Sequence, residues 1–179
     1  MSRRSAVGAA AGVLVLMMLG GSAWLDSRSF DALLTSVEAS DEALQRRNSE
    51  IMPLTSSYAQ AAGAERQRIA AEMRQLEAGT LRQVRNERQQ ARQLLVWPWD
   101  RDAAAARDRY VEHLGAWATL LEKNTSAEDD PSYDDADLST SVNTTARLSC
   151  DTLRSAEPLF GDFGDRMAVQ AANCRTVPR

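Results

Sequence analysis

Apolar residues recur every seven positions along the segment that follows residue 29, with charged and small polar residues between them. The five positions of this repeat are Phe30, Val37, Leu44, Ile51 and Tyr58. Such spacing places the apolar side chains on one face of a helix. A repeat of seven also suits a helix that packs along another at a shallow angle, as in a bundle or coiled coil.

The neighbouring row on the same helix is polar in its middle, at Ser40, Asp41, Arg47 and Asn48. A strong parallel zipper needs an apolar row there, so the sequence favours a seam inside an antiparallel bundle. Pro53 has no amide proton, and its ring crowds the preceding turn. It predicts a kink or a break near residues 49–52.

A second helical region runs from about residue 64 to residue 97, and its apolar face is thin. Gly63 either marks a turn or lies inside one long helix, so the sequence leaves open whether residues 54–97 form one helix or two. The region is rich in arginine. A solvated face explains this composition, and binding of an acidic partner or of lipid headgroups is the alternative.

The run Trp97-Pro98-Trp99-Asp100 predicts a sharp turn between two helices, because Pro98 disfavours a helical Trp97 and Asp100 can cap the next helix. The helix that follows has the clearest amphipathic pattern of the chain. Its apolar positions are Ala103, Ala106, Tyr110, Leu114, Trp117 and Leu121. We expect this face to be buried, with the tryptophan as a core residue.

Residues 126–137 form a predicted acidic loop with six carboxylates and one proline. Calcium is a weak alternative there, because the residue spacing and the glycine of a calcium loop are absent. The C-terminal segment, residues 138–179, carries two further predicted helices, at about 137–157 and 165–174.

The N-terminal run over residues 6–25 is apolar apart from Ser22 and follows Arg3 and Arg4. Its length predicts a transmembrane helix that acts as a signal anchor, with residues 1–5 in the cytoplasm and a helical bundle at 26–125 outside. The predicted location is the plasma membrane, in a single pass. A secretory signal cleaved near Ala23 is the alternative. Gly8 and Gly12 match a pattern that lets membrane-spanning helices pack closely, so formation of a homodimer through this segment is an alternative.

Composition narrows the function classes. The net charge is −4, which argues against a nucleic-acid partner. His113 is the only histidine, so it cannot belong to a histidine metal cluster. Its position next to the apolar face of its helix is typical of a histidine at the edge of a core, and a catalytic or ligand-binding role is the alternative. We predict no catalytic residues, no metal and no cofactor, and hence a protein that is not an enzyme.

Cys150 and Cys174 are the only cysteines. If both lie in an oxidising compartment, they have a single intramolecular pairing. We predict a disulfide between them that pins a C-terminal helical hairpin, and two free buried thiols are the alternative.

The predicted fold is therefore all-α: an N-terminal transmembrane helix, then an elongated antiparallel helical bundle with a disulfide-pinned C-terminal hairpin. The function this favours is a membrane-anchored, extracytoplasmic interaction or scaffold protein, whose partners are the membrane and another membrane or envelope protein. The alternatives are the ligand-binding exterior half of a sensor and a secreted helical protein.

Overall fold

The computed structural model describes residues 3–96, 101–126, 136–156 and 163–175, without the side chains of residues 3–26, 171 and 173–175. Within these ranges the chain forms five helices and no strand, which confirms the all-α prediction. The helices are α1 (Arg3–Gln60), α2 (Gly63–Gln93), α3 (Arg101–Ser126), α4 (Ala136–Ser155) and α5 (Gly164–Arg175).

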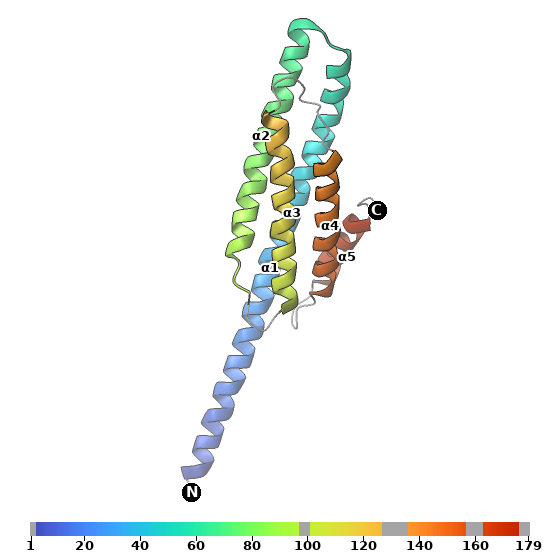
Figure 1. Cartoon of the computed structure of the whole chain (residues 1–179). Helices are drawn as coiled ribbons and strands as arrows, with labels where there is room; N and C mark the ends of the chain where they lie inside the picture. Colours follow the sequence, from blue (N-terminus) through green and yellow to red (C-terminus); the bar gives the residue numbers. More distant parts are fainter. Residues whose placement is uncertain (1–2, 97–100, 127–135, 157–162, 176–179) are drawn as a thin grey trace.

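The first four helices run up and down in turn and lie side by side as an antiparallel bundle (Figure 1). Helix α2 packs between α1 and α3, α3 packs on α4, and the short α5 packs on α4. The predicted helical bundle is confirmed. Its long axis follows α1, which at 1.5 Å per residue is about 87 Å long.

All five positions of the seven-residue repeat are buried, so the periodicity located the inner face of α1 correctly. The first three belong to the main core, which α1, α2, α3 and α4 build together. The last two, Ile51 and Tyr58, belong to a second, smaller core with Ile69, Ala70 and Met73. This distal core contains residues of α1 and α2 only.

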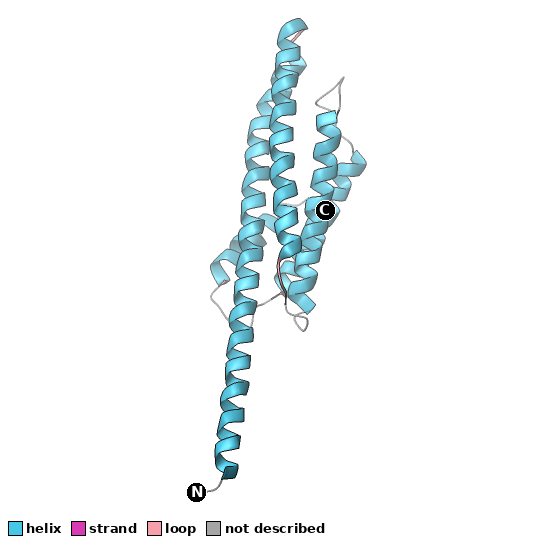
Figure 2. Ribbon diagram, turned by 90° about the vertical axis from the view of Figure 1, so that its left-hand side faces the viewer, coloured by secondary structure: helices cyan, strands magenta, loops and turns pink. Residues whose placement is uncertain are grey.

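The distal core lies where the α1–α2 hairpin extends past the ends of α3 and α4 (Figures 1 and 2). The hairpin turns at Ala61 and Ala62, and Gly63 has a φ of 56°. Glycine reaches this left-handed conformation without a steric penalty. The chain from residue 54 to residue 93 therefore contains two helices, the end of α1 and all of α2, which answers the question that the sequence left open.

Helix α1 continues through Pro53 to Gln60, so of the two predicted outcomes the break is wrong and the kink stays a prediction. Pro53 is exposed, and the buried Ile51 and Tyr58 pack on either side of it along the chain. The hydroxyl of Thr55 also donates to the Ile51 carbonyl at 2.9 Å. Tertiary packing of the flanking residues outweighs the missing backbone hydrogen bond.

Helix α3 buries the predicted face, and its tryptophan, Trp117, is partly buried against the main core. Residues 97–100 lie outside the described ranges, as do the predicted cap and turn. Their position between the ends of α2 and α3 agrees with the expected interruption. Helices α4 and α5 match the two predicted C-terminal helices to within two residues.

The predicted membrane span is not supported. Among the residues that the structure describes, no helix is long and apolar enough to cross a membrane. Residues 6–25 form part of the 58-residue α1. The single-pass plasma-membrane localisation inferred from this run is therefore contradicted.

Candidate functional site

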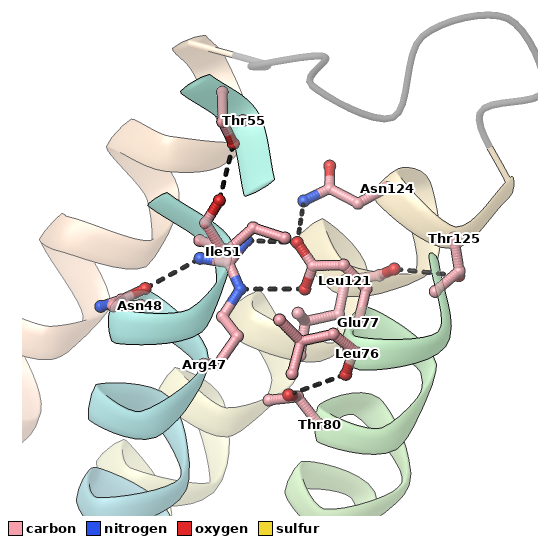
Figure 3. A network of polar contacts seen from close by, with 10 residues as sticks. All are labelled: Arg47, Asn48, Ile51, Thr55, Leu76, Glu77, Thr80, Leu121, Asn124 and Thr125. Atoms are coloured by element: carbon pink, nitrogen blue, oxygen red, sulfur yellow. Dashed lines mark hydrogen bonds and ion pairs between the residues drawn. The ribbon is translucent and has the colours of Figure 1, made fainter. Parts of the chain in front are cut away.

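A buried polar layer joins three helices near the distal end of the main bundle (Figure 3). Glu77 of α2 is 2% exposed and accepts two hydrogen bonds from Arg47 of α1, one of them from Nε at 2.9 Å. Asn124 of α3 donates to the same carboxylate at 3.2 Å. Arg47 also donates to Asn48 at 2.9 Å and lies over the ring of Trp117.

This layer is built to hold helices rather than to react. Both oxygens of Glu77 accept hydrogen bonds from Arg47, and Oε1 also accepts one from Asn124, so the carboxylate is used to connect three helices. A buried carboxylate is tolerated because its charge is paired and hydrogen-bonded. Asn124 Oδ1 is the one buried side-chain N or O atom without a partner among the described residues.

A second polar layer lies closer to the middle of the bundle. The Tyr110 hydroxyl on α3 is 2.7 Å from the carbonyl oxygen of Ser36 and 2.8 Å from Ser40 Oγ, both of which can accept its proton. Ser36 Oγ in turn donates to Glu87 of α2 at 3.0 Å. Burial raises the pKa of Tyr110 well above its usual range, so the phenol stays neutral.

His113 joins α3 to α4. Its Nδ1 lies 3.2 Å from the hydroxyl oxygen of Thr145, and the ring is half-buried. Burial lowers the pKa of His113 to about 4, partly offset by a hydrogen bond with the Val142 backbone. The imidazole is therefore neutral at pH 7, and no hydrogen bond joins it to a carboxylate of the described residues.

Helix α5 is fastened back onto α1 by one arginine. Arg166 donates to Glu38 at 2.8 Å from both Nε and Nη2, to Asp31, and to the hydroxyl of Thr35 at 3.0 Å. These bonds raise the pKa of Arg166 above its usual range. Beside them, the rings of Phe163 and Phe30 meet edge to face, with centroids 5.3 Å apart.

The outer face of α2 near its C-terminal end carries the largest excess of positive charge on a described helix. Four arginines lie within eleven residues, at Arg82, Arg85, Arg88 and Arg92. The only acid among these residues is Glu87, which is engaged by Ser36 of α1.

Among the described residues, only one of these arginines forms an ion pair: Arg85, with Glu122 of α3. Arg88 instead lies against Gly115 and donates to the Val111 carbonyl at 3.2 Å. Burial, followed by repulsion from Arg92, lowers the pKa of Arg88. Arg82 and Arg92 thus have no ion-pair partner among the residues that the structure describes.

The structure tests the residues predicted for sites only in part. Cys150 lies half-buried in α4 and is disulfide-bonded, and no described cysteine is free. The side chain of Cys174 in α5 is not among those that the structure describes, so the disulfide between Cys150 and Cys174 stays a prediction. Gly8 and Gly12 lie in the first turns of α1, where only the backbone is described, and their role in helix packing stays untested.

Within the described ranges, no group of three or more His, Cys, Asp or Glu side chains is placed to hold a metal ion. The acidic loop falls mostly on residues 127–135, which lie outside those ranges, and so does the calcium alternative. Comparisons with protein-family models, with curated proteins and with solved structures found no match to this chain.

Sequence reasoning missed the buried polar layers. The polar companion row of α1 was the available signal, since Ser40 and Arg47 interrupt an apolar face at bundle positions. This polar row argues against a parallel zipper. It also marked the places where polar residues of other helices, Glu77 and Tyr110, meet α1.

Proposed function

We propose that the protein is a helical interaction or scaffold protein without catalytic activity, and that its partner is another protein. The observation that carries this proposal is that the buried polar groups form hydrogen bonds between helices. Arg47, Glu77 and Tyr110 all cross-link helices, which aligns them in one register. This design supports a long, stiff body that presents its outer faces to a partner.

Site-specific photo-crosslinking tests the proposal. A photoreactive amino acid is placed at Gln45 of α1, Gln89 of α2 or Thr140 of α4, all of which are exposed. We expect one face to give a reproducible crosslink to one protein in cells that express the chain. The absence of a specific product from all three positions would contradict an interaction role. A thermal shift with a small metabolite would favour the sensor alternative instead.

We also propose that Cys150 pairs with Cys174 and ties α4 to α5. Support comes from the bonded state of Cys150, from the contact between these two helices and from the absence of a third cysteine in the sequence. Closing a loop of this length stabilises the folded state by roughly 3 kcal/mol in the chain-entropy model.

Mass spectrometry of the non-reduced protein checks the pairing. We expect a peptide pair joined through these two residues and no alkylation before reduction. Alkylation of both thiols without reduction would show that the bridge is absent.

A further inference from the structure

The basic outer face of α2 contains exposed arginines on a side of the bundle that no other described helix covers. Arg82 and Arg92 are exposed and have no ion-pair partner among the described residues. Helix α2 packs against α1 and α3, and Figure 1 shows it at the edge of the bundle. The surface is therefore open along its length.

The spacing of these cations sets the size of what they can bind. Arg82 and Arg92 are ten residues apart on one helix, which is a separation of about 15 Å along its axis. The exposed residues between them include Gln83, Asn86 and Gln89. Their amides can donate to and accept from a peptide backbone, whereas guanidinium groups bind carboxylates.

Two features favour a polypeptide over a nucleic acid. The exposed part of this face has no aromatic side chain on which a base could stack. The whole chain has a net charge of −4, so a long polyanion would be repelled by the rest of the molecule. A short acidic segment meets the arginines without that penalty.

We propose that the outer face of α2 between Arg82 and Arg92 docks a short acidic segment of a protein partner. This inference rests on the proposed interaction function and names the face and the chemistry of the partner. The contact is polar and lacks an apolar anchor, so it forms quickly, is weak and loses affinity as salt rises. Arg88 lies beside this face, at the contact with α3, where its guanidinium packs against Gly115 and donates to the Val111 carbonyl.

The first test measures binding of a fluorescent deca-glutamate peptide to the full-length protein at low salt. The double variant Arg82→Glu/Arg92→Glu is expected to bind at least tenfold more weakly than the unaltered protein. The control is Arg101→Glu/Arg147→Glu, which makes the same charge change at exposed sites on α3 and α4 and is expected to bind normally. Circular dichroism verifies that both variants stay folded, and Arg82→Gln/Arg92→Gln is expected to give an intermediate loss.

Equal weakening in the two charge-reversal variants would show a net-charge effect only and would overturn the proposal. Tighter binding of a 20-base-pair DNA duplex than of deca-glutamate would overturn it as well. Photo-crosslinking separates this inference from the broader one. Capture from Gln45 or Thr140 but not from Gln89 would refute the α2 face and leave the interaction function standing, whereas no capture from any position would refute both.

Discussion

Glu77 and Arg47 show how a single pair of residues stabilises the alignment of helices. Both are largely removed from solvent, with side chains 2% and 13% exposed, and each provides most of the polar contacts of the other. Removal of one partner leaves an uncompensated buried charge, which costs far more than an exposed pair contributes.

Glu77→Ala is therefore expected to lower the free energy of unfolding by about 3 kcal/mol. The double variant Arg47→Met/Glu77→Leu should recover most of that loss, because it replaces the pair with apolar volume. Urea denaturation followed by circular dichroism measures both. Glu42→Ala, which breaks an exposed pair with Arg46, is the control and should change little. A loss after Glu77→Ala no larger than in this control would show that the pair is not effectively buried.

His113 makes stability depend on pH, because burial lowers its pKa in the folded protein. Its folded pKa is about 4, below the value of about 6.5 expected in the unfolded chain. The unfolded state therefore takes up a proton first as pH falls. Stability is complete above pH 6.5 and is lost progressively between pH 6.5 and pH 4.

Between pH 7.5 and pH 5.0 we expect the free energy of unfolding to fall by up to about 2 kcal/mol. The same titration on His113→Gln should show a much flatter dependence, because His113 is the only histidine. Urea denaturation at each pH supplies the data. Parallel curves for the two proteins would mean that the histidine titrates normally in the fold.

At the scale of single elements, the α1–α2 connection depends on backbone conformation more than on side chains. Gly63 begins α2 with a positive φ, and no atom lies within 4 Å of the position a Cβ would take. Gly79 lies inside α2, also without a neighbour within 4 Å, and its φ is not positive. The two glycines thus differ in conformation and not in available space.

Alanine at these two positions is expected to act in opposite directions. Gly63→Ala should destabilise the protein by about 1–2 kcal/mol, since an L-residue resists the left-handed region. Gly79→Ala should stabilise it by up to about 1 kcal/mol through helix propensity. Thermal unfolding of the two variants side by side measures the difference. A stabilising Gly63→Ala would show that the turn relaxes to another geometry.

At the scale of the whole molecule, two cores of unequal size imply two levels of stability. The main core draws residues from four helices, whereas the distal core consists of five buried residues of α1 and α2. Local opening requires less free energy where fewer apolar contacts are lost. The Arg47–Glu77 layer lies at the boundary between the two cores in both sequence and space.

Hydrogen exchange followed by mass spectrometry should therefore resolve two classes of amide. Peptides from the distal hairpin, residues 51–73, are expected to exchange faster than peptides containing Leu114 or Leu121 of α3, which are 0% exposed. Glu77→Ala should increase the difference between the two exchange rates, because it weakens the Arg47–Glu77 layer between the two cores. Uniform protection along α1 and α2 would show that the hairpin opens only with the whole bundle.

The sequence by itself determined the all-α class and the inner faces of α1 and α3. Helical periodicity is local, so Phe30 to Tyr58 on α1 and Ala103 to Leu121 on α3 identified their buried faces without knowledge of any neighbour. The limits of α4 and α5 followed from local stop signals in the same way. The length of the apolar run over residues 6–25 did not by itself establish a membrane span.

Only the tertiary structure decided what the polar positions do. Arg47 meets a residue 30 positions away, Asn124 one 47 away and Tyr110 one 74 away. No local pattern encodes such separations, since they depend on how the helices lie against one another. The same limit applied to Pro53 and Gly63. Packing of the neighbouring residues keeps α1 helical through Pro53, and Gly63 adopts a positive φ where the turn between α1 and α2 ends. The basic face of α2 was visible in the sequence, but only the structure showed that Arg85 pairs with Glu122 while Arg82 and Arg92 have no ion-pair partner among the described residues.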